Sequence, residues 1–175
     1  RKYDNVIGVC GTHGKTTVTS MIVHTLFNAG LDPAAVIGGK LGTIGGNGRV
    51  GRSDIMVCES CEYHDTFLHL SPNIAVLLNI DSDHMEYFKT IENLIASFQK
   101  FAAMAQTVIV NADDERSMYA MRDIKANMIT FGESAFADYR IDDIVEGERA
   151  AHSFKLYHKG EFVADISLKI PGRHN

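Results

Sequence analysis

A glycine-rich segment near the amino terminus carries the residue types that bind phosphate. It reads GTHGKTT from Gly11 to Thr17, between a short apolar run and a segment with helical spacing. Phosphate binding needs convergent backbone N–H groups, the amino-terminal end of a helix and a cation. Gly11 and Gly14 let the backbone wrap closely around an anion. Lys15 can then reach the β- and γ-phosphates of a nucleotide, and Thr16 can place its hydroxyl on Mg²⁺.

The spacing of this segment differs from the common phosphate-loop pattern, in which a glycine stands five residues before the glycine of the glycine–lysine pair. Val9 occupies that position here. A tighter loop of the form G-T-x-G-K-T supplies the same groups, because none of these contacts depends on a glycine at position 9. The alternative is a glycine-rich turn with a surface lysine. We prefer phosphate binding, because a strand, this loop and an amphipathic helix follow each other directly.

Acidic and histidine side chains follow two further strands of the expected sheet. Glu59 ends the apolar run DIMVCE. The sequence DSDH, which holds Asp81, Asp83 and His84, follows the run NIAVLLNI. Ligands of open α/β sheets bind beyond the carboxyl ends of the strands, so we expect these groups to converge with Lys15 if the strands are neighbours. Helix capping by the acids, and a position of His84 at the start of a helix, are the alternatives.

Apolar periodicity predicts the elements that position these residues. Continuous or alternating apolar runs predict strands, and recurrence every three or four residues predicts helices. The expected strands cover residues 5–10, 34–39, 54–59, 73–80, 107–111 and 127–132. The expected helices cover residues 16–29, 90–106 and 114–122. Residues 38–51 are rich in glycine and lack helical spacing, so they predict a loop or a loose hairpin.

The pattern changes after Gly132. Residues 133–170 alternate between apolar and polar side chains and contain a Lys159–Gly160 turn, which predicts antiparallel strands. We therefore expect an α/β fold with a mostly parallel, doubly wound sheet over residues 1–132. The phosphate loop follows its first strand, and residues 133–170 add a small antiparallel β appendage.

The composition disfavours two classes of partner. Hydrophobic residues make up 45% and charged residues 22% of the 175 residues, which is ordinary for a soluble domain with its own core. The formal net charge of −5 argues against nucleic acid, because binding a phosphate backbone needs a basic surface. The sequence contains no secretory signal, and no apolar run reaches the ~18 residues of a membrane span. We therefore expect neither nucleic acid nor a membrane as a partner.

The cysteines indicate a reducing compartment. Their number is odd and low, with Cys10, Cys58 and Cys61, which does not suit a disulfide framework. We therefore expect a cytoplasmic location. Cys58 and Cys61 form one C-x-x-C pair, which could be a redox pair or half of a zinc site. The sequence has no second pair, and Cys58 continues an apolar run, so we interpret it as a core residue.

These segments resemble a known family. The loop GTHGKTT is similar to the short phosphate loop of the Mur ligases, ATP-dependent amide-forming ligases of peptidoglycan synthesis. The segment CESCEYHDTFLHLSPNIAVLLNIDSDHMEYF resembles the same family, and PGRHN at 171–175 resembles the start of its link to a third domain. The loop contains a histidine, His13, and in this it most resembles the loop of the branch that adds L-alanine to UDP-N-acetylmuramate.

The resemblance implies that residues 1–175 form the ATP-binding central domain of a multidomain ligase. The sequence starts without methionine and ends on a polar run, so we expect a piece of a longer chain. On this interpretation, the N-terminal UDP-binding domain and the C-terminal amino-acid domain lie outside it. The piece alone is therefore expected to be inactive as a ligase.

The resemblance also implies roles for single residues. Lys15, Glu59 and His84 are the expected catalytic residues, and Thr16, Glu59 and His84 the expected metal ligands, with ATP and Mg²⁺ as cofactors. The expected ATP-binding set is Gly11, Thr12, His13, Gly14, Lys15, Thr16, Thr17 and Asn175.

Other polar residues keep open roles at this stage. Lys40 and Arg52 are candidates for contacts with a phosphate or carboxylate of the acceptor. Glu62 matches an acidic position of the family, but a position on an exposed face is an equal alternative. Lys100 is interpreted as a solvated helix residue.

The implied reaction joins L-alanine to UDP-N-acetylmuramate through an acyl phosphate formed with ATP. Two alternatives stay open. Another Mur-type ligase, such as one that attaches a recycled tripeptide to the same sugar nucleotide, shares GTHGKTT. A nucleotide-binding switch or transport ATPase would make no amide bond, but such a protein has no need of the sequence NIDSDH.

Overall fold

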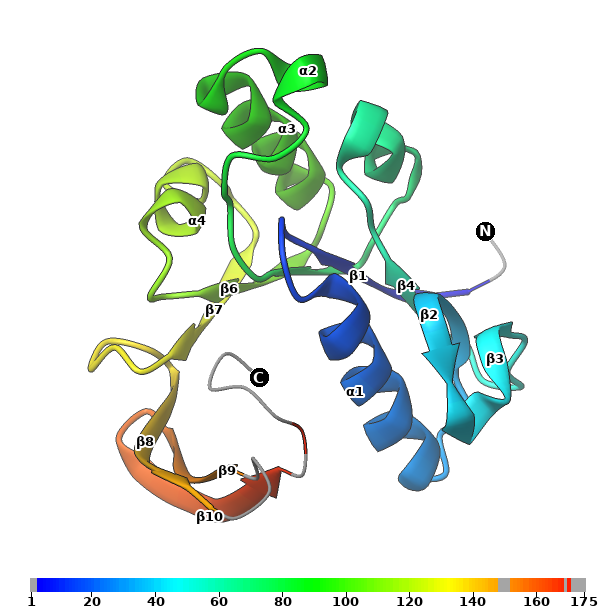
Figure 1. The fold of residues 1–175 in the computed structure, drawn as a ribbon, viewed down its shortest axis with the longest axis vertical. Helices are drawn as coiled ribbons and strands as arrows, with labels where there is room; N and C mark the ends of the chain where they lie inside the picture. The colour runs from blue at the N-terminus through cyan, green and yellow to red at the C-terminus, as the bar shows by residue number, and fades with distance from the viewer. Residues whose placement is uncertain (1–2, 148–151, 169, 171–175) are drawn as a thin grey trace.

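A computed structural model of the chain describes residues 3–147, 152–168 and 170. Within these residues, ten strands form one sheet, and helices lie on both of its faces (Figure 1). The strands are β1 (Asn5–Cys10), β2 (Ala34–Leu41), β3 (Gly46–Arg49), β4 (Ile55–Glu59), β5 (Ile74–Leu77), β6 (Thr107–Asn111), β7 (Asn127–Gly132), β8 (Tyr139–Glu146), β9 (His152–His158) and β10 (Glu161–Leu168). The helices are α1 (Lys15–Asn28), α2 (Met85–Phe88), α3 (Ile91–Ala103) and α4 (Glu115–Ala120), with the 3₁₀ helices η1 (Gly42–Ile44) and η2 (Tyr63–His69).

The strand order is β10-β9-β8-β7-β6-β5-β1-β4-β2-β3. Strands β2, β4, β1, β5, β6, β7 and β8 pair in parallel. Strands β3, β9 and β10 join through antiparallel pairs. The expected fold class, a mostly parallel α/β sheet with antiparallel strands at its C-terminal end, is confirmed. One detail differs from the expected appendage, because β8 pairs in parallel with β7 and so extends the main sheet.

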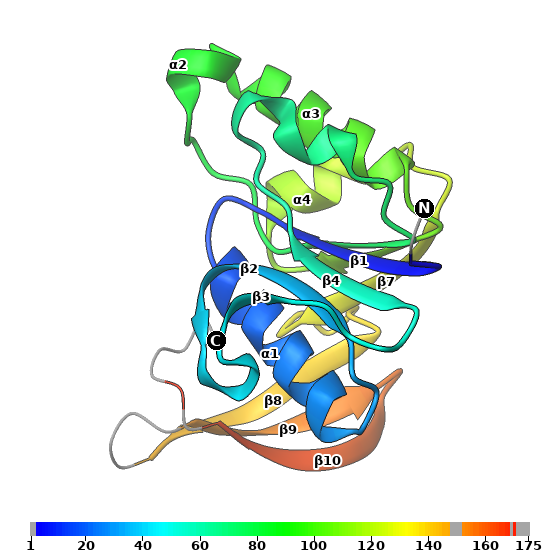
Figure 2. The ribbon, with the colours of Figure 1, turned by 90° about the vertical axis from the view of Figure 1, so that its right-hand side faces the viewer.

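Helix α1 packs on one face of the sheet, and α3 and α4 pack on the other (Figure 2). The buried side chain of Val23 from α1 joins Val9, Val57 and Val76 from the strands beneath it. On the opposite face, Leu94, Phe98 and Phe101 of α3 are buried in a second cluster. This two-sided burial explains why the central strands are continuously apolar rather than alternating.

Local sequence explains where α3 and α4 begin. The Thr90 hydroxyl caps α3 by accepting a hydrogen bond from the Asn93 N–H at 3.3 Å. The Asp114 carboxylate caps α4 by accepting one from the Ser117 N–H at 2.7 Å. Both side chains satisfy a backbone donor that the first helical turn leaves free.

One expected element was left open between two alternatives, and two further elements were not expected. The glycine-rich residues after Ile37 form a β2–β3 hairpin around η1, which confirms the hairpin alternative. The sequence did not reveal η2, in which His64 and Asp65 adopt left-handed φ angles of 53° and 56°. Helix α2 was not among the expected elements, because its four residues are too short to display a helical period. His84 does stand at its start, which confirms the alternative position given for this residue.

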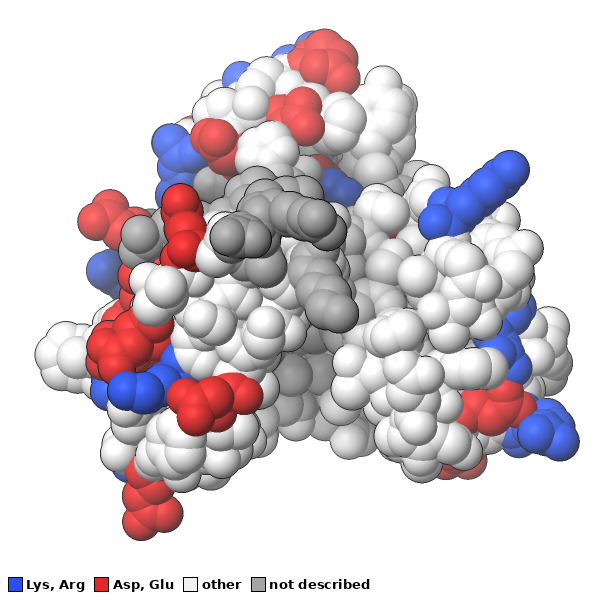
Figure 3. Space-filling model, turned by 60° about the horizontal axis from the view of Figure 1, so that its bottom comes forward, with Lys and Arg blue, Asp and Glu red and all other residues white. Residues whose placement is uncertain are grey.

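The charge distribution agrees with the acidic composition. Figure 3 shows Asp and Glu side chains gathered on the left of the view, towards the part of the molecule that Figure 1 labels β8 to β10. Strands β8 and β10 contain five acidic residues: Asp142, Asp143, Glu146, Glu161 and Asp165. Among the residues that the structure describes, no helix has the length and apolar character needed to cross a membrane.

Phe101 provides a test of the core on the α3 face. Its side chain is 0% exposed and its ring stacks on that of Phe67 with a centroid distance of 4.6 Å. We expect Phe101→Ala to lower the free energy of unfolding by about 3–5 kcal/mol, because it leaves a cavity. Phe136→Ala is the matched control, since Phe136 is 95% exposed, and it should change stability by no more than about 0.5 kcal/mol. Urea denaturation measures both, and equal effects would contradict this packing.

Candidate functional site

Three chain segments meet at one edge of the sheet, beyond the carboxyl ends of β4, β1 and β5. β1 pairs with β4 on one side and with β5 on the other, both in parallel. The glycine-rich loop follows β1, Glu59 ends β4, and residues 78–84 follow β5. The expected convergence of these polar residues is therefore confirmed at the level of strand order. In a sheet of this kind, such a position is where ligands bind.

The glycines of the loop are needed for its backbone shape. Gly14 caps α1 with a left-handed φ of 85°, and Gly11 has a φ of 135°. A Cβ atom on Gly11 would lie 3.0 Å from the Leu78 Cβ and 3.1 Å from the Asn79 backbone. The loop thus closes tightly on the segment after β5 and delivers the chain directly into the amino-terminal end of α1, which favours an anion.

Asn79 holds this loop in place, and sequence reasoning missed it. Its carbonyl accepts from the Thr12 N–H at 3.0 Å. Its side-chain oxygen accepts from the His13 N–H at 2.8 Å, and its amide donates to the His13 carbonyl at 3.0 Å. The Thr12 hydroxyl adds two bonds to the backbone of Asp81. The one sequence signal for this contact with the loop is that Asn79 is a polar residue at the end of a buried apolar run.

Lys15 is bound inside the loop by three different groups. Its ammonium donates to the Gly11 carbonyl at 2.6 Å and to the Thr12 carbonyl at 3.1 Å. It also lies 3.3 Å from Oε1 and 3.1 Å from Oε2 of Glu62. Glu62 is 0% exposed, so the exposed-face alternative for this residue is wrong.

Thr16 and Glu59, two of the three predicted metal ligands, are in direct contact. The Thr16 hydroxyl donates to Oε1 of Glu59 at 2.9 Å. The other carboxylate oxygen accepts the Gly38 N–H of strand β2 at 2.6 Å. A hydroxyl and a carboxylate are the hard oxygen donors that Mg²⁺ prefers, so this pair fits the ion.

His84 belongs to a neighbouring group with Glu62 and Asp83. One potential ligand atom from each of these residues lies within 4.8 Å of the others. His84 has a left-handed φ of 53°, and its ring packs on that of Tyr63 with a centroid distance of 4.5 Å. His84 therefore lies near Glu62, which in turn contacts Lys15. Glu62 and Asp83 are therefore further candidate ligands.

Neither aspartate after β5 caps α2, which has no side-chain cap. The Asp83 carboxylate accepts the His84 N–H at 2.8 Å. The Asp81 carboxylate accepts the Ser82 N–H at 2.7 Å and bonds Arg116 at 3.0 Å. The Ser82 hydrogen bond, followed by that of Arg116, holds the pKa of Asp81 below its ordinary value.

A cavity of about 490 Å³ adjoins the loop on the outer side of α1. It combines hydroxyl and apolar groups and has room for a base and a sugar. Its lining residues are Thr16, Thr17, Ser20, Met21, His24, Leu41, Thr43 and Ile170. Asn175, the remaining predicted ATP contact, lies outside the described residues.

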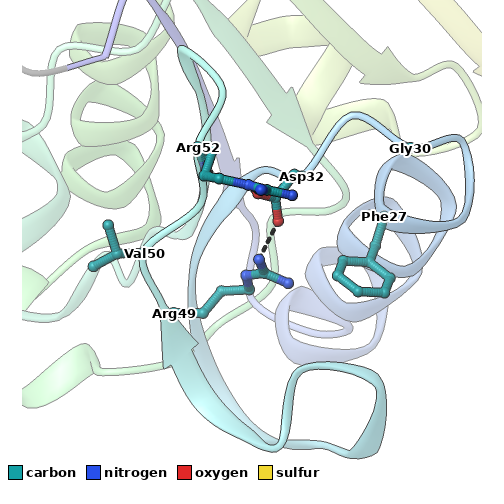
Figure 4. A pocket seen from close by; sticks show the side chains of 6 residues that line it. All are labelled: Phe27, Gly30, Asp32, Arg49, Val50 and Arg52. Atoms are coloured by element: carbon teal, nitrogen blue, oxygen red, sulfur yellow. Dashed lines mark hydrogen bonds and ion pairs between the residues drawn. The ribbon is translucent and has the colours of Figure 1, made fainter.

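A second cavity, of about 540 Å³, lies at the other end of α1 and contains Arg52 (Figure 4). The Arg52 side chain bonds Asp32 at 2.9 Å, and Asp32 also pairs with Arg49. The Arg49 guanidinium lies 4.9 Å from the ring centroid of Phe27. The structure therefore separates Arg52 from the phosphate loop by the length of α1. Lys40, the other candidate for acceptor contacts, is exposed on β2.

Cys58 is a core residue, as the sequence predicts. Cys10 and Cys58 are buried, Cys61 is exposed, and all three are free. Burial raises the pKa of Cys10, with a further contribution from the negative charge of Glu62. Burial, and then the charge of Glu59, also raises the pKa of Cys58. Among the described residues, the metal-competent group found contains no cysteine.

The structure is an α/β domain with a glycine-rich loop between its first strand and its first helix. Comparison with known sequences identifies the family to which such a domain belongs. The family model described as the Mur ligase middle domain matches residues 9–175. The chain belongs to this family.

Two relatives with high sequence identity to the chain carry the same name. The chain is 43% identical over 178 residues to UDP-N-acetylmuramate--L-alanine ligase of Caldanaerobacter subterraneus subsp. tengcongensis, covering 100% of this chain and 39% of that protein. It is 41% identical over 179 residues to the ligase of the same name in Acetivibrio thermocellus, covering 100% of this chain and 38% of that protein. The chain therefore spans well under half the length of these relatives.

Solved structures show the same fold. The UDP-N-acetylmuramate-alanine ligase of Thermotoga maritima superposes with a TM-score of 0.83 at 27% identity, over 97% of this chain and 38% of that one. UDP-N-acetylmuramate:L-alanyl-gamma-D-glutamyl-meso-diaminopimelate ligase from Neisseria meningitides gives a TM-score of 0.84 at 25% identity, over 97% of this chain and 56% of that one.

The thiols give a direct test of the burial around the site. We expect one cysteine, Cys61, to react quickly with a thiol reagent at neutral pH. Cys10 and Cys58 should react at least roughly tenfold more slowly, because buried thiols with raised pKa values form little thiolate. Mass spectrometry of partly labelled protein identifies the modified residue. Rapid labelling of Cys10 would contradict the closed arrangement beneath the loop.

Proposed function

We propose that this chain is the ATP-binding part of a ligase that joins L-alanine to UDP-N-acetylmuramate. One observation carries the proposal: the phosphate loop with Lys15, the Thr16–Glu59 contact and the His84 group meet at the ends of three adjacent strands. The two curated relatives described above bear the name of this activity, which supports the choice of amino acid and acceptor.

The nucleotide would lie across the amino-terminal end of α1. The backbone of Gly11 to Thr17 would cradle the phosphates, and Lys15 would bind oxygens of the β- and γ-phosphates. The cavity beside Thr16 and Thr17 would take the adenosine. Ile170 also lines this cavity, and Asn175 stays a predicted contact of the nucleotide.

Thr16 and Glu59 would hold one Mg²⁺ together with the phosphates, and Glu59 and His84 would hold a second. When bound, the ions would neutralise charge on the phosphate oxygens. Glu59 is oriented for this role by the Gly38 N–H, and His84 by the Tyr63 ring.

The chemistry would proceed in two steps. A carboxylate of the sugar-nucleotide acceptor attacks the γ-phosphorus of ATP, the bond to ADP breaks, and an acyl phosphate forms. The amine of L-alanine then attacks the acyl carbon, and the tetrahedral intermediate collapses to an amide and inorganic phosphate. Catalysis by this chain would consist mainly of positioning and charge neutralisation, as is general for phosphoryl transfer.

The domain plan follows from the same proposal. Residues 1–175 would be the central domain of a three-domain ligase, with residues 1–132 as its βαβ core. Residues 133–170 would be the β appendage, and residues 171–175 the start of the link to the next domain. Acceptor and amine would be bound largely by the other two domains. We further propose a cytoplasmic location, in agreement with the three free thiols.

A phosphate-release assay on the full-length protein tests the reaction. We expect release of phosphate from ATP to require both UDP-N-acetylmuramate and L-alanine. A requirement for the tripeptide in place of L-alanine would identify the second candidate, which the structural similarity to the Neisseria ligase favours. Phosphate release without any acceptor would overturn both ligase proposals and favour a nucleotide-binding switch or transport ATPase.

Lys15→Ala tests the assignment of the phosphate loop. We expect the variant of the full-length enzyme to lose roughly two or more orders of magnitude in ligase turnover, because the γ-phosphate loses its charge partner. Circular dichroism should show an intact fold. Lys100→Ala is the matched control, because Lys100 is exposed on α3, and it should retain wild-type turnover. Near-normal turnover of Lys15→Ala would rule out the assigned role.

A further inference from the structure

We propose that Glu62 competes with nucleotide phosphate for Lys15, and thereby makes nucleotide binding at this loop depend on a divalent cation. The inference rests on the proposed nucleotide site. It adds a role for a residue that is neither part of the loop nor one of the predicted metal ligands.

Every donor of the Lys15 ammonium already has an acceptor. An ammonium group has three protons to donate. The acceptors are the Gly11 carbonyl at 2.6 Å, the Thr12 carbonyl at 3.1 Å and the Glu62 carboxylate, 3.1 and 3.3 Å away. A phosphate oxygen can therefore bind Lys15 only after one of these acceptors is released.

Glu62 is the acceptor that opposes an incoming phosphate. The two carbonyls belong to the loop itself, whereas Glu62 comes from the segment after β4. Its side chain is 1% exposed and that of Lys15 is 14% exposed, so water screens the pair poorly. While the pair persists, Lys15 offers a phosphate no net positive charge. The carboxylate would also repel the phosphate directly.

When Lys15 turns away, the negative charge of the buried Glu62 carboxylate is left unpaired, and a bound cation can compensate it. A buried carboxylate that loses its partner is strongly unfavourable. Apart from its ion pair with Lys15 at 3.1 Å, Oε2 of Glu62 is buried without a hydrogen bond. Ligand atoms of Glu62, Asp83 and His84 lie within 4.8 Å of one another. Oxygen and imidazole donors in this arrangement suit a divalent cation, which would replace the ammonium beside Glu62.

Phosphate binding and cation binding would then strengthen each other by the same factor, as linkage requires. Without a cation, turning Lys15 towards the phosphate leaves Glu62 uncompensated. With a cation, Lys15 is free to bind phosphate. The same carboxylate that weakens metal-free binding thus enforces the use of the metal–nucleotide complex.

The test measures the dissociation constant of ATP for full-length protein by calorimetry, in EDTA and in Mg²⁺. We expect Glu62→Gln to bind metal-free ATP about tenfold more tightly than wild type, because the competing charge is gone. The gain in affinity from Mg²⁺ should fall by about the same factor. A purely structural role of Glu62 predicts the opposite sign, with weaker binding in both conditions. That result, or unchanged binding, would overturn the inference.

Asp65→Asn is the matched control. Asp65 lies in η2, is partly buried and bonds Tyr87 and Ser97, so the variant removes a carboxylate from the same segment without touching Lys15. It should keep the wild-type response to Mg²⁺. Equal loss of this response in both variants would attribute the effect to η2 as a whole and overturn the inference. Thermal melts verify the folding of each variant.

Lys15→Met gives an independent readout that does not require folded Glu62→Gln protein. Without nucleotide, it frees Glu62 from its ammonium, so Mn²⁺ binding followed by electron paramagnetic resonance should become several-fold tighter. Unchanged or weaker Mn²⁺ binding would overturn the exchange.

The two proposals fail on different results. Wild-type protein that binds no ATP even with Mg²⁺ refutes the nucleotide site. ATP binding with an unaltered metal response in Glu62→Gln refutes only the role of Glu62.

Discussion

The parallel pairing of β1 with both β4 and β5 is the constraint on which the site depends. Because the three strands run in the same direction, their carboxyl ends lie at one edge, and the loop, Glu59 and the segment from Leu78 to His84 must emerge together. The apolar side chains that hold this pairing are buried from both faces, by α1 on one side and by α3 and α4 on the other. The stability of the core and the geometry of the site therefore have the same origin.

Hydrogen bonds across that edge then shape the individual groups. The Asn79 side chain replaces a strand partner for the backbone of His13, which gives the loop a fixed conformation without a glycine at position 9. The Gly38 N–H orients Glu59 towards Thr16. Each of these contacts joins residues far apart in the sequence, so the site exists only in the assembled sheet.

Much of the fold follows from local pattern. The runs at 5–10, 107–111 and 127–132 are strands with the expected bounds, because continuous apolar segments bounded by polar residues leave few alternatives. The segments that resisted prediction are η2 and α2. Their backbones use left-handed residues, His64, Asp65 and His84, and tertiary packing rather than periodicity stabilises such conformations.

The sequence by itself determined the glycine-rich loop, its place between a strand and a helix, and the membership of a ligase family, because these depend on residues adjacent in the chain. Only the tertiary structure decided which acid lies beside Lys15. Glu59 and Glu62 are three positions apart, yet one lies against Thr16 and the other is buried against Lys15. The turn of the chain out of β4 separates them, and its direction depends on packing that no local pattern encodes.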